Sequence, residues 1–420
     1  MKICGIACVK DSRELLQATM THLVLNGISD FYLYDHGSDP ALAGALSSAF
    51  RAGGVRVRIL RKETPRYFQR AMVSALTELA RMDGFETALA FDADEFWCST
   101  VPGRTLVEQI SMEMTAGLDA LGVPVVNYVQ HRGVSAFTVD SLKTCRYAVE
   151  PSADPARPAR ERVDAGAPFV AMPFPAKVIA RLACDIRFTE GNHGITRSQD
   201  ESAQAEASGI VVRHLSLSAR GDLAVKREQG RRRIAAGFDP EIGWQLQRLA
   251  FRSDEELDAY WDNNSWHLAD DGRVLVGDYD RLIEDSALVG IGRDLAPAID
   301  RLGASPMVGA DGASAVGADG TSAVVAIEAP RLERLLESLV DDFGTADMRL
   351  SEREEEVATL RQEVAILRHE LEQRSASLAQ IQATLEAERV EMRSVLDDIE
   401  KSVSWRVTAP LRALRRDWHR

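Results

Sequence analysis

The stretch that decides the fold reads TALAFDADEFW, residues 87–97. Its first half, 87–91, predicts a short buried strand, and acidic residues follow that strand directly. Ligands of parallel α/β sheets bind beyond the carboxyl ends of the strands. Alternation along an extended chain sends Asp92 and Asp94 to the same side, where two carboxylates repel unless a divalent cation or a hydrogen-bonding ligand lies between them. The motif alone is also compatible with a solvated acidic turn.

Short apolar runs alternate with amphipathic segments on the amino-terminal side of this motif. The sequence predicts strands at 3–9, 31–34, 55–60 and 87–91, and helices at 12–26, 41–52 and 67–82. Such alternation is typical of a parallel sheet covered by helices on both faces. Beyond the motif the pattern is mixed, with a surface loop expected at 150–168 and helical segments with aromatic anchors at 211–233 and 240–266.

The composition of the chain argues against several classes of protein. The chain has 420 residues, of which 45% are hydrophobic, enough for two or three folded units. Its formal net charge of -14, with no basic stripe before residue 300, argues against nucleic-acid binding. The start is too weakly apolar for a signal peptide, and no run approaches about 18 apolar residues. Five scattered cysteines without a CxxC pair suggest a reduced cytoplasm.

The carboxyl-terminal quarter has a different organisation. Residues 303–330 contain the tandem near-duplicate GADGASAV and GADGTSAV and are expected to form a flexible Gly/Ala/Ser linker after a catalytic domain at 1–302. A heptad frame follows, and it predicts a long α-helical coiled coil at 331–400 that makes the protein a homo-oligomer. An amphipathic helix folding back on its own domain is the alternative. The a positions are Leu336, Phe343, Leu350, Val357, Val364, Leu371, Leu378, Leu385, Met392 and Ile399.

The last segment, 401–420, reverses the charge of the coiled coil. Its sequence from 403 onwards, VSWRVTAPLRALRRDWHR, interleaves five arginines with apolar residues. This mixture suits peripheral contact with an anionic membrane surface. The alternative is a basic terminus that stays in solution or docks on another protein.

Several motifs together resemble one enzyme group. VKDSRELL at 9–16, FYLYDHGSD at 31–39, FDADEFW at 91–97, AKVIAR at 176–181, GNH at 191–193 and RHLSLSARGDLAVK at 213–226 occur in order, with His22, Gly27 and Gln69 between them. The chain resembles GT-A glycosyltransferases related to family 2, in particular a bacterial group with a DADEF strand end. Similar SWR-TAPLR tails occur in bacterial glycosyltransferases that build surface polysaccharides. One departure is Ser12, where the group usually has an acidic residue.

The resemblance implies an α/β fold with a GT-A, Rossmann-like nucleotide-sugar-binding domain, and it implies roles for residues at the strand ends. Asp35 would accept hydrogen bonds from a base and ribose, and Asp11 would flank the same pocket. Asp92 would contact the ribose and a Mn²⁺ or Mg²⁺ ion. Asp94 would be the direct metal ligand, and His214 would be a further one, because neutral imidazole suits manganese.

Positive and aromatic side chains complete the expected donor and acceptor sites. Lys177 and Lys226 are the preferred candidates to neutralise a diphosphate leaving group, ahead of Arg181 and the arginines at 231–233. A set of tryptophans offers a sugar-stacking platform, although core packing is expected for at least two of them. This set comprises Trp97, Trp244, Trp261 and Trp266.

The expected reaction moves a sugar from a nucleotide-sugar donor to a glycan or lipid-linked acceptor, with inversion if the resemblance holds. A carboxylate or imidazole must then take the proton of the acceptor hydroxyl. The sequence does not choose among four candidates for this base. They are Glu95, Asp185, Glu190 and His193.

Two other functions compete with this interpretation. Phosphohydrolases of the haloacid-dehalogenase type also carry DxD at a strand end, but they need Thr or Val where this chain has Phe96. A non-catalytic coiled-coil scaffold with a degenerate transferase domain is the second. The joint presence of Asp35, Asp92 and Asp94 argues against it. The identity of neither donor nor acceptor follows from the sequence.

Overall fold

The structure is a computed structural model, and it divides into two compact units, Met1–Asp347 and Met348–Arg420. It describes residues 1–38, 42–50, 54–61, 69–152, 157–183, 186–197, 202–235, 243–303, 324–326, 380, 382, 385–386, 389–399, 401–402 and 408.

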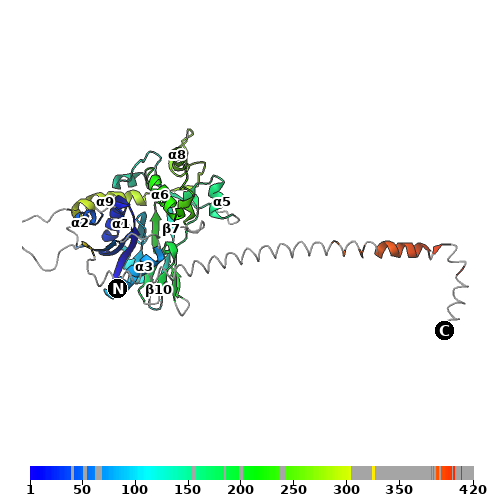
Figure 1. Cartoon of the computed structure of the whole chain (residues 1–420), viewed down its shortest axis with the longest axis horizontal. Coiled ribbons are helices and arrows are strands. Elements are labelled where there is room, and N and C mark those ends of the chain that lie inside the picture. The colour runs from blue at the N-terminus through cyan, green and yellow to red at the C-terminus, as the bar shows by residue number, and fades with distance from the viewer. Residues whose placement is uncertain are drawn as a thin grey trace, which may run out of the picture. The chain divides into compact units, whose positions relative to one another are not determined.

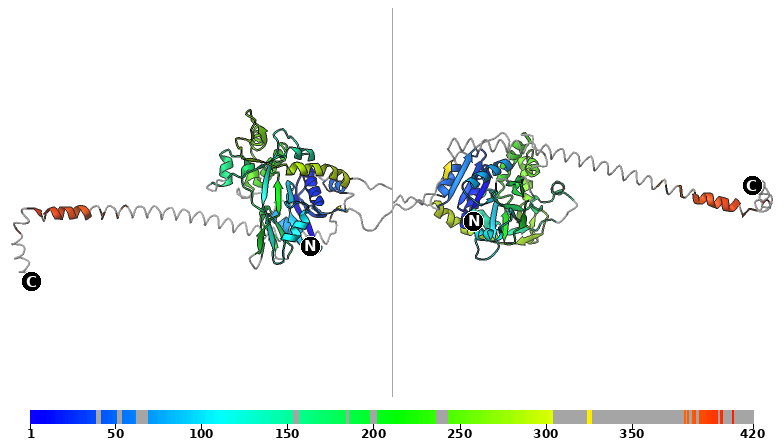
Figure 2. Two further views of the ribbon diagram at one scale, coloured as in Figure 1. Left: turned by 180° about the vertical axis from the view of Figure 1, so that it is seen from behind. Right: turned by 90° about the horizontal axis from the view of Figure 1, so that it is seen from below.

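A mixed sheet forms the centre of the first unit. Its strand order is β12-β6-β9-β4-β1-β2-β3-β17. The strands are β1 (Ile3–Val9), β2 (Asp30–Asp35), β3 (Arg56–Arg61), β4 (Thr87–Ala90), β6 (Ala120–Val123), β9 (Lys177–Arg181), β12 (Gln204–Glu206) and β17 (Val324–Ala326). β1 to β4 are mutually parallel, as predicted, whereas β9 runs antiparallel between β4 and β6. The right-hand view of Figure 2 shows blue strands of this part side by side.

Helices cover both faces of this sheet, which explains why β1 and β4 are buried along nearly their whole length. One face packs against α1 (Arg13–Leu25), α2 (Leu42–Ala49) and α4 (Leu106–Glu113). The opposite face packs against α3 (Gln69–Met82). Figure 1 shows α1 and α3 on opposite sides of the blue strands, with α9 (Ala287–Gly303) beside α1 and α2. α9 contacts α1, α2 and the short helix η1 (Val139–Thr144).

A second sheet begins where the first one ends. Its order is β16-β8-β7-β13-β5, and residues 91–94 carry the chain from β4 into β5. The strands are β5 (Glu95–Ser99), β7 (Val125–Val129), β8 (Tyr147–Val149), β13 (Ile210–His214) and β16 (Leu282–Glu284). Around them lie α5 (Ala159–Asp164), η2 (Phe169–Ala171), α6 (Asp222–Ala235), α7 (Trp244–Gln247), α8 (Asp254–Asp262), β14 (Trp266–Leu268) and β15 (Val274–Val276). The strands β10 (Ile186–Phe188) and β11 (Ile195–Arg197) and the short helix η3 (Glu190–Asn192) belong to the α3 side of the first sheet.

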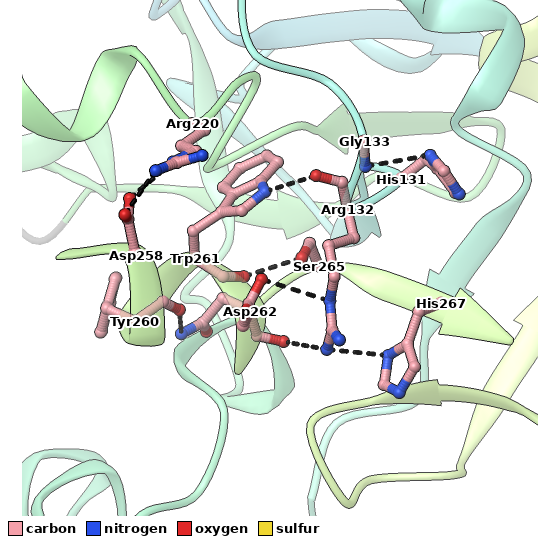
Figure 3. A network of polar contacts seen from close by, with 11 residues as sticks. His131, Arg132, Gly133, Arg220, Asp258, Tyr260, Trp261, Asp262, Ser265 and His267 are labelled. Carbon is pink, nitrogen blue, oxygen red and sulfur yellow. Dashed lines mark hydrogen bonds and ion pairs between the residues drawn. The ribbon is translucent and has the colours of Figure 1, made fainter. Parts of the chain in front are cut away.

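A polar network fixes α8 to this second layer (Figure 3). The indole Nε1 of Trp261 donates to the carbonyl of Arg132 at 2.8 Å. The Arg132 guanidinium lies 3.3 Å from the Asp262 carboxylate and 3.0 Å from His267 Nδ1. Arg220 and Asp258 form an ion pair beside it. Because Trp261 is only 1% exposed and anchored in this way, it packs the core and is no sugar platform.

Several predicted elements beyond residue 100 were wrong in type. Residues 211–214 lie in β13, and the helix of that region starts only at Asp222. The β-branched run of β13 is buried between β5 and β7, an environment that favours a strand. The predicted loop at 150–168 contains α5, and the helical segment at 240–266 is divided into α7, α8 and the start of β14.

The segments predicted as linker, coiled coil and tail lie mostly outside the described residues. Within the predicted linker, β17 pairs in parallel with β3. The described part of the second unit is helical at 389–399, and apolar side chains of the heptad frame such as Met392 and Val395 are exposed there. The coiled coil and the basic tail stay predictions. No helix in the described part of the chain has the length and apolarity to cross a bilayer.

Candidate functional site

Two predicted pocket residues meet at the carboxyl ends of β1 and β2. Asp35 ends β2, and its Oδ1 accepts the backbone N–H of Ser38 at 2.8 Å. The N–H of Asp11, whose φ is 53°, donates to Ser38 Oγ at 2.9 Å. Arg61 Nε lies 3.7 Å from the second oxygen of Asp35. Asp35 is buried, at 2% exposure, and stabilises the turn at 36–38, whose Ser38 hydroxyl accepts the N–H of Asp11.

The acidic motif itself is a turn between the two sheets. The backbone N–H of Glu95 donates to the carbonyl of Asp92 at 3.1 Å, and the N–H of Asp92 donates back to Glu95 Oε2 at 3.1 Å. The strand ends at Ala90, so the expected period-two alternation of Asp92 and Asp94 does not apply. Each carboxylate has a different partner as a result.

Asp92 belongs to a buried cluster around Lys177. The Lys177 Nζ lies 2.7 Å from Asp92 Oδ2, 2.7 Å from Glu95 Oε1 and 2.8 Å from the carbonyl of Gly191. Burial opposes protonation of Lys177, but the two carboxylates outweigh it and raise the pKa of its ammonium group. Gln69 Nε2 donates to the other oxygen of Asp92 at 3.3 Å. Lys177 thus neutralises the acidic turn instead of extending toward a diphosphate, and Asp92 faces a lysine where a metal ion was expected.

Asp94 has a histidine partner. Its Oδ1 lies 3.7 Å from Nε2 of His214, and its carbonyl accepts the N–H of Leu215 at 2.9 Å. Burial opposes ionisation of Asp94, but His214 in its protonated form, Lys226 and Lys177 outweigh it and hold the pKa of this carboxyl below its usual range. Asp94 and His214 therefore lie together at this point of the site.

The donor set of Asp94 and His214 fits a divalent cation of the manganese type. One carboxylate oxygen and one imidazole nitrogen are ligands that Mn²⁺ accepts, and a diphosphate would supply further oxygens. Within the described ranges, no three His, Cys, Asp or Glu side chains gather into a closed metal site. A cation held here would therefore depend on oxygens of the bound substrate.

The four candidates for the catalytic base differ in their exposure and in their partners, where the structure describes them. Glu95 is 1% exposed and paired with Lys177, so an acceptor hydroxyl cannot reach it in this arrangement. Burial raises the pKa of Glu95 to about 7 against the opposing field of Lys177. Asp185 and the side chain of Glu190 lie outside the described residues.

His193 is the described candidate that is exposed. Its ring is exposed, and Nδ1 lies 3.1 Å from the carbonyl of Ala176, so Nδ1 carries the proton and Nε2 has the lone pair. Partial desolvation and the charge of Lys177 lower the pKa of His193, which keeps the ring neutral at pH 7. Gly191 has φ +69°, and a Cβ there would lie 2.6 Å from the His193 ring. The glycine therefore gives the ring its position beside the Lys177 cluster.

The remaining predicted cations and aromatic residues have structural partners. Arg181 donates to the carbonyls of Leu118 and Thr115, away from the acidic turn. Arg231 and Arg232 pair with Glu228 on α6.

The tryptophans divide into core and surface. Trp97 is fully buried, as Trp261 is, which confirms core packing for two of the four. Trp266 donates to the carbonyl of Thr144 and packs on His131 and Tyr147.

Trp244 is half-buried at the end of an aromatic row that starts at the metal-ligand candidate. Phe174 lies edge-on to His214 with centroids 4.9 Å apart, Phe169 lies 5.3 Å from Phe174, and Trp244 lies 6.0 Å from Phe169. Phe169, Phe174 and Asn127 were not predicted from the sequence. The Oδ1 of Asn127 lies 2.8 Å from His214 Nδ1. The one available signal for Asn127 is a polar residue within the apolar run VVNYV.

Comparisons with known proteins leave the family open. No protein-family model matches the chain, and no curated protein matches it. Among solved structures, the chain is similar to a Bacillus anthracis protein assigned as a glucose-1-phosphate thymidylyltransferase and solved in complex with sucrose. The identity is 9%, the alignment covers 59% of this chain and 83% of that chain, and the TM-score is 0.24. A likeness at that level carries no argument about this chain.

Proposed function

We propose that the protein is a metal-dependent glycosyltransferase that uses a nucleotide-sugar donor. The observation that carries the proposal is the pair of Asp94 and His214, 3.7 Å apart at the carboxyl edge of the parallel strands. The same edge contains Asp11 and Asp35 at the ends of β1 and β2. A nucleotide bound at these strand ends would have its diphosphate directed toward the Asp94 pair.

The roles of the side chains follow from their surroundings. A Mn²⁺ or Mg²⁺ ion, when bound, would neutralise charge that develops on the departing diphosphate. Asp94 and His214 would hold that ion, and Lys226 would add positive charge beside it. Lys177 keeps the acidic turn compact by pairing with both Asp92 and Glu95, and Asp94 is left to face the ligand.

On the acceptor side, His193 is the described residue best suited to take the proton of the attacking hydroxyl. Its Nε2 bears a lone pair, and Lys177 fixes the neighbouring Gly191 through its carbonyl. The aromatic row ending at Trp244 offers an apolar surface for a sugar ring of a glycan or lipid-linked acceptor. Inversion of the anomeric centre is part of this proposal, because the exposed imidazole of His193 would act as a base on the acceptor hydroxyl and not as a nucleophile on the sugar.

The test is a panel of UDP-, GDP- and dTDP-sugars incubated with the purified full-length protein, with and without Mn²⁺. Release of nucleoside diphosphate that requires both the metal and one class of donor supports the proposal. Binding of no nucleotide sugar under any condition would favour the non-catalytic scaffold. Release of inorganic phosphate from simple phosphate esters would favour a hydrolase.

A further inference from the structure

The side-chain amide of Asn127 is buried, and its hydrogen-bond partners distinguish Oδ1 from Nδ2. It lies on β7, paired with His214 of β13 in the parallel register, and is 5% exposed. Its Nδ2 lies 3.3 Å from the carbonyl of Val170 and 3.4 Å from that of Met172. Carbonyl oxygens only accept hydrogen bonds, so the amide nitrogen must face them. The Oδ1 of Asn127 is therefore the atom that faces His214.

The amide orientation determines the tautomer of His214. Oδ1 of Asn127 lies 2.8 Å from His214 Nδ1 and can only accept, so Nδ1 carries the proton of the neutral ring. Nε2 then has the lone pair and faces Asp94 Oδ1 at 3.7 Å, too far for a hydrogen bond. The opposite tautomer would set two acceptors 2.8 Å apart, and a flipped amide would turn Oδ1 toward two carbonyls.

Neighbouring contacts hold both partners in this arrangement. Phe174 packs edge-on against the His214 ring at 4.9 Å, which restricts its rotation. The carbonyl of Asp94 accepts the N–H of Leu215, the residue after His214, at 2.9 Å. This hydrogen bond joins the backbone segments that carry the His214 ring and the Asp94 carboxylate. In the neutral ring, Nε2 of His214 and Oδ1 of Asp94 are both acceptors, and they face each other across 3.7 Å.

We infer that Asn127 is a positioning residue that fixes the Nδ1–H tautomer of His214 and so offers the Nε2 lone pair, together with Asp94, to a divalent cation. The metal part of this inference rests on the proposed function. The tautomer part rests on the hydrogen bonds of Asn127 alone. An Asp94–His214 proton-relay dyad is the alternative chemistry, and it requires the proton on Nε2.

The experiment reads the tautomer without any assay of turnover. Nitrogen-15 NMR of the full-length protein labelled at histidine, assigned with His214→Gln, reports which ring nitrogen is protonated at a pH where the ring is neutral. We expect the Nδ1–H tautomer in the wild-type protein and a mixture in Asn127→Leu. Titration with Mn²⁺ alone, followed by electron paramagnetic resonance, should show affinity reduced about 10- to 100-fold in that variant.

Two further variants separate positioning from packing. Asn127→Asp keeps an acceptor for Nδ1–H and should retain both the tautomer and metal binding, at a cost in stability because its second oxygen replaces the Nδ2 donor that faces the carbonyls of Val170 and Met172. Asn264 accepts the N–H of Val170 at 3.2 Å and donates to Tyr260, so Asn264→Leu loosens the same segment without touching His214. It should leave the tautomer unchanged.

An Nε2–H tautomer in the wild-type protein, or an unchanged tautomer in Asn127→Leu, overturns the inference. A wild-type protein with the Nδ1–H tautomer that binds no Mn²⁺, alone or with any nucleoside diphosphate, overturns the metal-dependent function and leaves the role of Asn127 in tautomer choice supported.

Discussion

Lys177 and Glu95 form an ion pair inside the protein, with Nζ 2.7 Å from Oε1 and side-chain exposures of 7% and 1%. Each charge has been removed from water, and the pair is stable only because Asp92, Gly191 and the backbone supply the remaining contacts. Breaking one side of such a pair leaves an uncompensated buried charge. The acidic turn therefore depends on Lys177 for its stability as well as for its shape.

We predict that Lys177→Met lowers the free energy of unfolding by about 3–5 kcal/mol, the range for removing one partner of a buried pair. Urea denaturation measures the change. Adding Glu95→Gln to Lys177→Met should recover part of the loss, because it removes the orphaned charge. Lys143→Met, which breaks an exposed pair with Asp140, is the matched control and should cost under about 1 kcal/mol. Equal losses for the two single variants would contradict the prediction.

Asp94→Asn tests the proposed chemistry. It should abolish turnover and manganese-dependent binding of a nucleoside diphosphate, because it removes the charge that the site directs at its ligand. The variant should also be less stable, since neighbouring positive groups hold the pKa of Asp94 below its usual range and so favour its charged form in the folded protein. Isothermal titration calorimetry and urea denaturation measure the two effects, with Asp140→Asn as control. Undiminished transfer by Asp94→Asn would remove the central claim.

His22 gives a pH dependence of known sign. It is buried, its Nε2 donates to the carbonyl of Trp97 at 2.9 Å, and burial lowers its pKa to about 4. The unfolded chain binds a proton at this residue near pH 6.5, whereas the folded chain does not. Stability from the neutral ring is therefore complete above pH 6.5 and is lost as the pH falls toward 4.

Between pH 7.5 and 5, this residue should cost the wild-type protein about 2 kcal/mol of unfolding free energy. His22→Gln lacks the titration, so its stability should fall less over the same interval. Urea denaturation of both proteins at a series of pH values measures the difference. Parallel pH profiles would show that His22 does not titrate as described.

The heptad frame predicts self-association. A chain ending at residue 328, which keeps β17, should be monomeric and retain the activity of the full-length protein, since the apolar seam is removed and the catalytic unit is kept. Multi-angle light scattering measures the mass of both chains. A full-length protein that is monomeric at micromolar concentration would refute the coiled coil as an oligomerisation segment.

The basic tail predicts attachment to anionic lipid. Five arginines near an anionic leaflet each contribute on the order of 1 kcal/mol, so the full-length protein should sediment with phosphatidylglycerol vesicles and be released by salt. Deletion of 403–420 should abolish this binding, while neutral phosphatidylcholine vesicles serve as control. Equal sedimentation of intact and shortened chains would exclude the tail as the membrane contact.

The strands and helices of the first 90 residues were predictable because each contains a local apolar pattern that burial on both faces demands. The failures have local causes too. Asp92 and Asp94 were placed by alternation, but the Glu95 N–H bonds to Asp92 and bends the chain out of extended form. The short apolar run at 211–214 is compatible with either a helix or a strand. It is a strand because it pairs with β5 and β7.

Of the pair at the candidate site, sequence pattern supplied both Asp94 and His214, because they belong to recognisable motifs. It could not supply the partners. Lys177 lies 85 positions from Asp92 along the chain, and Asn127 lies 87 positions from His214. Such contacts depend on strand register, which no local pattern encodes.

Because these partners are far apart in the sequence, the residues of the site become available at different times during synthesis. β1 to β4 are complete once residue 90 has been synthesised, and this part of the sheet can begin to pack on α1 and α3. The site needs β9 for Lys177 and β13 for His214, so a nascent chain shorter than these strands has the acidic turn without its cation. Until then Asp92, Asp94 and Glu95 repel one another. The ribosome must therefore deliver over half of the polypeptide before all the carboxylates of the DADEF turn have their partners.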